Sequence, residues 1–469
     1  MPQVNTSNIQ ARYNEQLARL YYLVDYTPDD VLAYVLSGVD LSDINIIVTT
    51  DVDSLPYLYY GSSLLPSGMV YFVESLGIIV ISSANTWLTL DKVIVRTDTD
   101  YARTVWSWGC NNIGQFGDNS VVSKSSPVSG VGGFTDWCQV SVGCEHTLGV
   151  RTNGTIWAWG AGDSGRLGDN CVSNRSSPVS VIGGFTDWSQ VAAGFRSSFG
   201  LRTNGTIWSW GYNQQSGNLG DGTTVNKSSP VSVIGGFTDW CQVAASGTSN
   251  SVCQWALAVR QNGTAWAWGW NSCGQLGNNS TVSRSSPVSV VGGVTDWCQV
   301  SAGAQHSMGL RQTGQLYAWG YGFGGRLGNN STDTQLQPVA VVGGFTDWCQ
   351  FNAGGINSFA IRTNGTLWAW GEAQAGALGN NCATYAGSKL SPVSVLGGFT
   401  DWCQVSGGYR FALAVRQNGS AWAWGWNCFG ALGTNNTTSR SSPVSIVGIA
   451  SNWFQVSGGR QFSAGVTFD

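Results

Sequence analysis

The chain has 469 residues, of which 10% are charged and 42% hydrophobic, and its formal net charge is −4. This length exceeds one ordinary hydrophobic core and predicts several domains or a repeat architecture. Intrinsic disorder is excluded, because disordered chains are rich in charge and poor in aromatic residues, whereas this chain has 24 tryptophans. Lysine and arginine do not cluster, so we expect no nucleic-acid partner.

The first ten residues are polar and lack the basic and apolar regions of a signal peptide. A first amphipathic helix is predicted over about residues 7–24 and a second over about 28–36. The apolar stripe of the first helix either packs within the chain or forms a bundle between subunits, and both alternatives stay open. This candidate oligomerisation stripe is Ile9, Tyr13, Leu17, Leu20 and Val24.

A β-meander is predicted over about residues 54–95, with a tight turn at Glu74 to Gly77. Its run Leu65-Pro66-Ser67-Gly68-Met69-Val70-Tyr71-Phe72-Val73-Glu74, followed by a strand that begins near Trp87, resembles a small module of tailed-phage fibre and appendage proteins. The resemblance implies attachment to a particle, commonly as a trimer. We therefore expect residues 1–100 to form a small α+β attachment and oligomerisation domain.

From about residue 101 the chain repeats itself with a period of about 51 residues. A second marker of the type Gly-Gly-Phe-Thr-Asp-Trp keeps step with the first, which is Trp-x-Trp-Gly or, once, Tyr-x-Trp-Gly. Such a period with strand-like content is typical of a propeller or a solenoid. The first marker begins at Trp106, Trp157, Trp208, Trp266, Tyr317, Trp368 and Trp422.

Each repeat is predicted to form four short strands, joined to the next Trp strand by a hairpin such as Asn204-Gly205. The last strand, Phe462 to Phe468, has no Trp strand after it, and the first Trp strand, Thr104 to Trp108, has no partner before it. Pairing these two strands closes a ring and removes its exposed edges. In the second repeat the expected strands are 155–159, 177–182, 189–193 and 198–202.

These repeats resemble those of the regulator of chromosome condensation family. The residues that carry the resemblance include Gly165-Arg166-Leu167-Gly168-Asp169, Ser177-Pro178-Val179 and Gly143-Cys144-Glu145-His146-Thr147. Members of this family are seven-bladed β-propellers, and the founding member catalyses guanine-nucleotide exchange on a small GTPase and docks on chromatin. The resemblance implies a mainly β, seven-bladed propeller over residues 101–469, and by itself it carries neither activity.

No catalytic group, metal site or cofactor is expected. The 12 cysteines form no Cys-x-x-Cys pair, and only two histidines, His146 and His306, could complete a zinc site. In other repeats the histidine position is expected to hold Ser198, Asn357 or Arg410, which does not fit a general base with one fixed chemistry. We therefore expect a protein that is not an enzyme.

Function is expected where the repeats differ. The residue after each Trp-Gly pair is aromatic in four repeats, which places several rings around one mouth of the propeller. Such rings suit stacking on sugars or contact with a protein, and the alternative that they only cover the blade ends stays open. The candidate binding residues are Tyr212, Trp270, Tyr321 and Trp426.

The leading hypothesis is a non-enzymatic structural protein of a tailed-phage virion: a tail fibre, spike or head-surface appendage. Its N-terminal domain would attach to other virion proteins, with a homotrimer favoured. Its propeller would face outward and bind a host-surface glycan or protein, or a neighbouring virion protein. The protein would be made in the host cytoplasm, without membrane insertion, and would reside in the virion. The alternative is a soluble protein-interaction module or a guanine-nucleotide exchange factor of the regulator of chromosome condensation family.

Overall fold

The structure is a computed structural model that describes residues 46–49, 70–73, 78–83, 86–89, 102–130, 132–247, 254–449 and 452–468. The chain divides into two compact units, of which one is Arg12–Tyr101 and the other combines Met1–Ala11 with Ala102–Asp469. The two predicted helices lie outside the described residues. The same holds for the candidate oligomerisation stripe Ile9, Tyr13, Leu17, Leu20 and Val24.

The described part of the smaller unit is one four-stranded sheet in the order β1-β2-β3-β4. Strand β1 (Ile46–Thr49) runs parallel to β2 (Val70–Val73), whereas β3 (Ile78–Ser83) is antiparallel to both β2 and β4 (Thr86–Thr89). Three of these strands fall within the segment for which the sequence predicts a meander. The attachment role of this unit stays a prediction.

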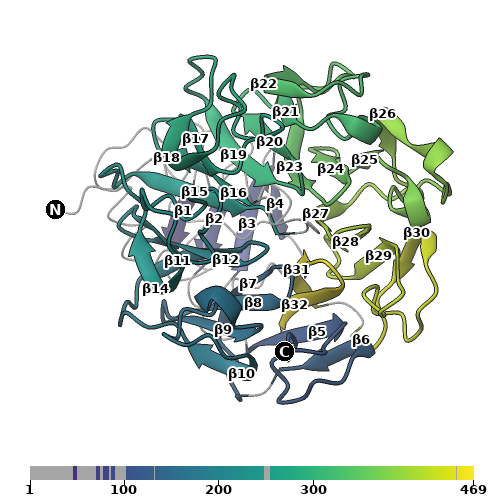
Figure 1. Cartoon of the computed structure of the whole chain (residues 1–469). Helices are drawn as coiled ribbons and strands as arrows, with labels where there is room; N and C mark the ends of the chain where they lie inside the picture. Colours follow the sequence, from purple (N-terminus) through teal and green to yellow (C-terminus); the bar gives the residue numbers. More distant parts are fainter. Residues whose placement is uncertain are drawn as a thin grey trace. The chain divides into compact units, whose positions relative to one another are not determined.

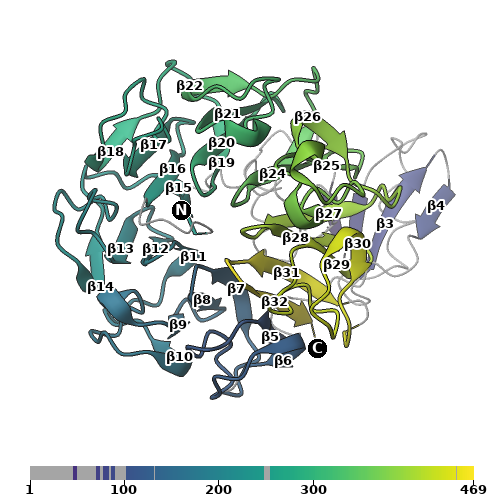
Figure 2. The ribbon, with the colours of Figure 1, turned by 45° about the vertical axis from the view of Figure 1, so that its right-hand side comes forward.

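The larger unit contains seven four-stranded antiparallel sheets arranged around one axis, as Figures 1 and 2 show. This confirms the mainly β, seven-bladed propeller expected from the repeat. In blades 1 to 6 the four strands pair with one another in sequence order. The first strand of each blade contacts the first strands of the neighbouring blades. Blade 1 contains β7 (Trp137–Val142), β8 (His146–Arg151), β9 (Ile156–Gly160) and β10 (Arg175–Ser180).

The other blades repeat this arrangement. Blade 2 contains β11 (Trp188–Ala193), β12 (Ser197–Arg202), β13 (Ile207–Gly211) and β14 (Lys227–Ser232), and blade 3 contains β15 (Trp240–Ala245), β16 (Trp255–Arg260), β17 (Ala265–Gly269) and β18 (Arg284–Ser289). Blade 4 contains β19 (Trp297–Ala302), β20 (His306–Arg311), β21 (Leu316–Gly320) and β22 (Gln335–Ala340). Blade 5 contains β23 (Trp348–Ala353), β24 (Asn357–Arg362), β25 (Leu367–Gly371) and β26 (Lys389–Ser394), and blade 6 contains β27 (Trp402–Gly407), β28 (Phe411–Arg416), β29 (Ala421–Gly425) and β30 (Arg440–Ser445).

Blade 7 closes the ring with strands from both ends of the repeat region. It contains β31 (Trp453–Gly458), β32 (Phe462–Phe468), β5 (Arg103–Gly109) and β6 (Lys124–Ser129). Strands β32 and β5 pair along their whole length, from Phe462 opposite Gly109 to Phe468 opposite Arg103, and lie side by side in Figure 1. The predicted closure by these two strands is confirmed.

In six of the seven blades a glutamine on the first strand forms a hydrogen bond with the neighbouring blade, and among the described residues Gln299 of blade 4 is the exception. In blade 1 the Gln139 side chain accepts a hydrogen bond from the Val191 amide at 2.8 Å and donates one to the Val191 carbonyl at 3.3 Å. Gln455 of blade 7 likewise accepts from the Val140 amide at 2.8 Å and so joins the last blade to the first. These side chains replace the backbone partners that the first strands lack on that side.

A second contact joins blades through one carbonyl group. The Arg166 carbonyl of blade 1 accepts hydrogen bonds from Ser198 Oγ at 2.7 Å and from Trp210 Nε1 at 2.9 Å, both in blade 2. The carbonyl of Gln275 makes the same pair of contacts with blade 4. These serine and tryptophan side chains therefore join neighbouring blades.

The Asn-Gly turns have the predicted role. The Asn153 side chain accepts a hydrogen bond from the Thr155 amide at 3.1 Å, and Gly154 has a φ of +71°. A Cβ atom on Gly154 would lie 2.1 Å from the Thr186 carbonyl oxygen, so the position requires glycine.

The expected equivalents of the histidines are wrong by one residue in two repeats. His146 and His306 begin the second strands of their blades, and the residues that begin the other second strands include Ser197 and Phe411, not Ser198 and Arg410. Each of these four second strands begins three residues after a glycine, as His146 follows Gly143. Asn357 follows Gly354 at the same distance and begins its strand, so its predicted position is correct.

Candidate functional site on the loop face

One end of the propeller, which we call the loop face, carries the inner loops between first and second strands and the outer loops between third and fourth strands. The two sets of loops contact each other: the Trp270 amide donates to the Gln254 carbonyl at 2.8 Å, and the Trp426 amide donates to the Arg410 carbonyl at 2.9 Å. The opposite end, the turn face, carries the Asn-Gly hairpins. The predicted mouth of the propeller is therefore the loop face.

The four candidate aromatic residues occupy equivalent positions on this face but differ in exposure. Trp270, Tyr321 and Trp426 are partly buried, and Tyr212 is only 8% exposed. The Trp270 indole nitrogen donates to Ser272 Oγ at 2.6 Å. Three of the four rings therefore contribute to the accessible surface.

Further apolar residues, which the sequence analysis did not single out, ring the same face. Phe323 stacks on Tyr321 with 5.9 Å between ring centroids and lies 6.1 Å from the ring of Tyr385, in the next blade. Every outer loop carries at least one such exposed residue. These residues are Val121 and Val122 in blade 7, Val172, Val225 and Val282 in blades 1 to 3, and Phe323, Tyr385 and Phe429 in blades 4 to 6.

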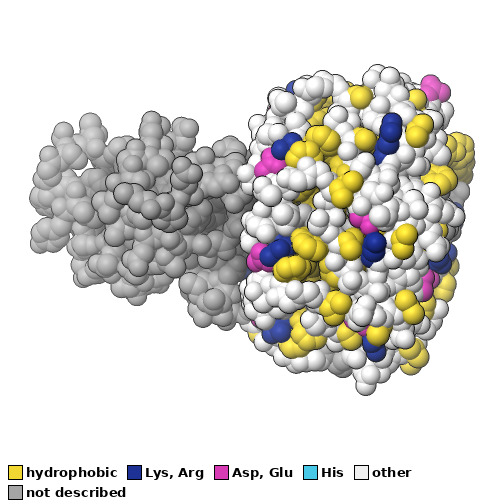
Figure 3. Space-filling view, turned by 60° about the vertical axis from the view of Figure 1, so that its left-hand side comes forward, with side chains coloured by type: hydrophobic (Ala, Val, Ile, Leu, Met, Phe, Trp, Pro, Cys, Tyr) yellow, Lys and Arg dark blue, Asp and Glu magenta, His cyan; other side chains and the backbone are white. Residues whose placement is uncertain are grey.

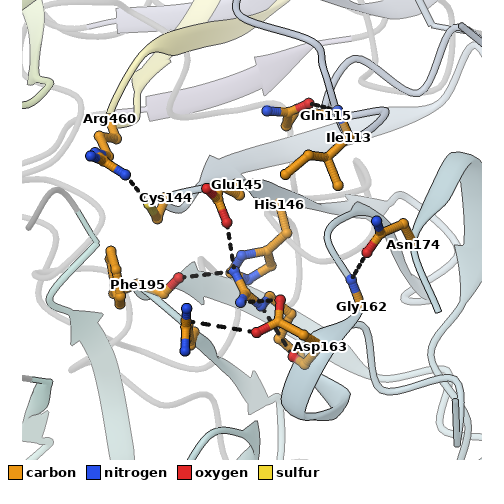
Figure 4. Close-up of polar contacts among 12 residues, drawn as sticks. Ile113, Gln115, Cys144, Glu145, His146, Gly162, Asp163, Asn174, Phe195 and Arg460 are labelled. Atoms are coloured by element: carbon orange, nitrogen blue, oxygen red, sulfur yellow. Dashed lines mark hydrogen bonds and ion pairs between the residues drawn. The ribbon is translucent and has the colours of Figure 1, made fainter. Parts of the chain in front are cut away.

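Three arginines, Arg196, Arg410 and Arg460, belong to the inner loops and lie nearer the propeller axis than the outer-loop residues. Arg196 pairs with Asp163 at 3.7 Å. Arg410 lies over the ring of Tyr409. An Arg460 amino group lies 4.0 Å from Cys144 Sγ and points toward it in Figure 4. Within the described part of the chain, neither Arg410 nor Arg460 has a carboxylate partner. The sequence analysis proposed none of the three as a binding residue, because only the fold brings the inner loops together.

Asp163 links blades 1 and 2, because it pairs with Arg166 of blade 1 and Arg196 of blade 2. It forms an ion pair with the fully buried guanidinium of Arg166, which also lies 3.8 Å from Glu145 Oε2 and donates to the Phe195 carbonyl at 3.3 Å. In blade 4 the equivalent Arg326 is paired instead with Glu372 at 2.8 Å. Burial lowers the pKa of Arg326, and Glu372 opposes that shift. These ion pairs hold the loops in place.

The two histidines do not form a catalytic site. Both are fully buried, and burial, with the neighbouring Arg166 or Arg326, lowers their pKa well below 6.5. His146 Nε2 lies 2.9 Å from Ser198 Oγ, whose own proton is donated to the Arg166 carbonyl. The hydroxyl is therefore committed to structure and is not available as a nucleophile.

The described cysteines form no metal site, and burial raises the pKa of three of them, Cys144, Cys298 and Cys349. Among the described residues, no group of three or more His, Cys, Asp or Glu could hold a metal ion. Burial raises the pKa of Cys144 to about 11, so its thiol stays protonated near neutral pH. The repeated cysteines are partly buried, and Cys138, for example, donates to the Val150 carbonyl at 3.3 Å.

Charged side chains are sparse on the outer surface. On the side of the propeller in Figure 3, basic and acidic groups of the described residues are scattered singly or in pairs and form no continuous patch. In the same part of the chain, no helix has the length and apolar character needed to cross a membrane.

Comparison with known proteins identifies the family. The RCC1-like domain matches residues 98–399, and the regulator of chromosome condensation (RCC1) repeat matches residues 402–431 and 418–466. The chain belongs to the RCC1-like family. This RCC1-like chain is 30% identical over 353 residues to the ultraviolet-B receptor UVR8 of Arabidopsis thaliana, a match that covers 72% of the chain and 76% of the receptor.

Two further matches are less extensive or less similar. The E3 ubiquitin-protein ligase HERC2 of Homo sapiens is 26% identical over 312 residues, which are 65% of this chain but 6% of the ligase. The crystal structure of Prp20p from Saccharomyces cerevisiae has a TM-score of 0.69 and 21% identity, and covers 78% of this chain and 92% of Prp20p. At this identity the similarity shows the fold.

These matches overturn the leading hypothesis from the sequence. The phage virion protein, the tail-fibre role and the virion location are wrong, because the chain aligns with a plant receptor, a plant RCC1 domain-containing protein and a human ubiquitin-protein ligase. The matches give no support to the phage-module resemblance, the trimer, the virion partners or the host glycan.

Proposed function

We propose that this RCC1-like chain is a non-catalytic protein-interaction module that binds a partner protein through its loop face. The observation that carries the proposal is the composition of that face: partly buried Trp270, Tyr321 and Trp426, exposed apolar residues in all seven outer loops, and the inner-loop arginines Arg410 and Arg460. Aromatic residues and arginine are the types most enriched in protein interfaces.

Relatives support a protein partner. Prp20p of Saccharomyces cerevisiae, which shares the fold, binds Gsp1p and histones. We do not extend nucleotide exchange to this chain, because similarity at 21% identity supports the fold alone. Carboxylates of a partner would meet Arg410 and Arg460, which have no acidic partner of their own among the described residues.

The experiment compares two double variants of the full chain as bait for proteins of its native cell. Trp270→Ala with Trp426→Ala removes two loop-face rings, whereas the control Ile182→Ala with Ile234→Ala removes exposed residues that follow fourth strands. We expect the loop-face variant to lose at least one partner by fivefold or more in quantitative mass spectrometry, while the control retains it. Recovery of the same proteins at the same levels with both variants would refute the proposal. Thermal melting of both variants checks that the propeller is intact.

A further inference from the structure

The turn face carries an ion pair that recurs in six blades. An arginine at the end of the second strand places Nε 2.7 to 2.9 Å from the aspartate of the Thr-Asp-Trp marker. The pairs are Arg151–Asp136, Arg202–Asp187, Arg260–Asp239, Arg311–Asp296, Arg362–Asp347 and Arg416–Asp401. The aspartate thus fixes the plane of each guanidinium.

In five of these blades the chain supplies a phenyl ring to that guanidinium. The phenylalanine of the Gly-Gly-Phe marker lies 3.9 to 4.2 Å from the guanidinium carbon and 4.7 to 5.2 Å from the tryptophan that begins the Trp-x-Trp-Gly marker. A cation over the face of an aromatic ring is a favourable electrostatic contact. The five rings are Phe134, Phe185, Phe237, Phe345 and Phe399.

Blade 4 has the arginine without the ring. Val294 stands at the position of the phenylalanine, and Tyr317 stands at the position of the tryptophan. Arg311 still pairs with Asp296 at 2.8 Å, but its side chain is 28% exposed, against 18 to 23% in the five blades that have the phenylalanine. The guanidinium carbon of Arg311 lies 5.8 Å from the Tyr317 ring.

The smaller side chains leave a pocket of about 220 Å³ beside Arg311. A closed apolar cavity of about 150 Å³ is enough for a benzene ring. One wall is the guanidinium and the other walls are largely apolar. The lining residues are Val291, Gly292, Val294, Trp297, Arg311, Tyr317, Gln337 and Pro338.

We propose that this pocket is a binding site for the phenylalanine side chain of a partner polypeptide. The five sister blades show which group fits between the fixed arginine and the third-strand aromatic residue, since each fills the same place with its own phenyl ring. In those blades the ring enters from a surface segment of polypeptide, and the open pocket of blade 4 can receive one in the same way. The site lies on the turn face and is separate from the loop face.

The test uses the full chain with N-acetyl-phenylalaninamide as the probe and saturation-transfer NMR as the measurement. N-acetyl-leucinamide is the control probe, because it is apolar but has no aromatic face. We expect saturation of the phenyl protons in the wild type and at least threefold less for the leucine probe. No transfer to the phenyl probe, or equal transfer to both, would overturn the proposal.

Two designed variants locate the site. Val294→Phe, which gives blade 4 the residue of its sisters, is expected to reduce the transfer at least fivefold without lowering the melting temperature, while Val282→Phe in an outer loop leaves it unchanged. Phe345→Val with Trp368→Tyr recreates the pocket in blade 5 and is expected to increase the transfer about twofold. Full transfer in folded Val294→Phe would place the probe elsewhere and overturn the proposal. Should Val294→Phe not fold, the blade 5 variant decides: no increase overturns the proposal.

Discussion

The two buried histidines predict a specific loss of stability in mild acid. His146 Nε2 lies 2.9 Å from Ser198 Oγ, and His306 Nε2 lies 2.8 Å from Ser358 Oγ. Each serine donates its proton to a backbone carbonyl, so the histidine donates from Nε2 and its Nδ1 is unprotonated. Both Nδ1 atoms are buried and have no hydrogen-bond partner among the residues that the structure describes. A second proton, on Nδ1, would therefore have no hydrogen-bond acceptor, and its positive charge would lie near that of Arg166 or Arg326.

The magnitude follows from linkage between protonation and folding. Burial lowers the pKa of both histidines well below 6.5 in the folded protein. Below pH 6.5 the unfolded chain binds protons that the folded chain does not, so stability falls as the pH falls and is recovered above pH 6.5. Over the whole range from pH 7.5 to pH 5.5 each histidine lowers the free energy of unfolding by up to about 1.4 kcal/mol, because the effect is nearly absent above pH 6.5. The pair therefore lowers it by up to about 3 kcal/mol.

The assay is urea unfolding of the full chain at pH 7.5, 6.5 and 5.5, followed by tryptophan fluorescence. The matched variant is His146→Phe with His306→Phe, because Phe411 and Phe462 begin the second strands of blades 6 and 7 and are fully buried there. Between pH 7.5 and pH 5.5 we expect the free energy of unfolding of the variant to fall by about 3 kcal/mol less than that of the wild type. An equal loss in both proteins would refute the reasoning.

Three further changes test the contacts that hold the blades, each measured as a shift of the urea midpoint. Gln455→Ala is expected to lower the free energy of unfolding by about 1 to 2 kcal/mol, since it removes the bond between the first strands of blades 7 and 1. Gln299→Ala is the control, because among the described residues no hydrogen bond to its side chain is found, and an equal loss there would contradict us. Trp210→Phe is expected to lower the free energy of unfolding by about 1 kcal/mol more than Trp159→Phe. The reason is that Trp210 Nε1 has a carbonyl partner, whereas Trp159 Nε1 has none in the described region. Equal losses in the two variants would be evidence against this contact. Gly154→Ala is expected to cost at least about 1 to 3 kcal/mol because of its positive φ, and an unchanged midpoint would show that the turn relaxes.

The ring could be predicted from the sequence because its signals are local and repeated. Two markers in register gave the blade count, and the unpaired strands at Thr104 to Trp108 and Phe462 to Phe468 gave the closure. The strand starts were less accurate. The strand expected at 177–182 begins at Arg175, because serine and proline gave it no clear alternation of polar and apolar residues.

The surface could not be predicted in the same way, because it depends on neighbouring blades. Tyr212 has the same position in its repeat as Trp270 but is almost fully buried. Arg410 and Arg460 come from different repeats, and only the fold places both in the inner loops. In contrast, Val294 stands out in the marker as Gly-Gly-Val-Thr-Asp-Trp and was available as a signal for the blade 4 pocket.

Blade 7 also constrains how the propeller can assemble during synthesis. Trp106 and Thr467, whose side chains bond at 2.9 Å, are 361 residues apart in the chain. Strand β5 leaves the ribosome before the other propeller strands, yet its partner β32 leaves after them. The free edge of β5 must therefore avoid wrong partners until translation of the repeats is complete. Slower elongation or a stalled ribosome near β32 would prolong this exposure and favour aggregation of the nascent chain.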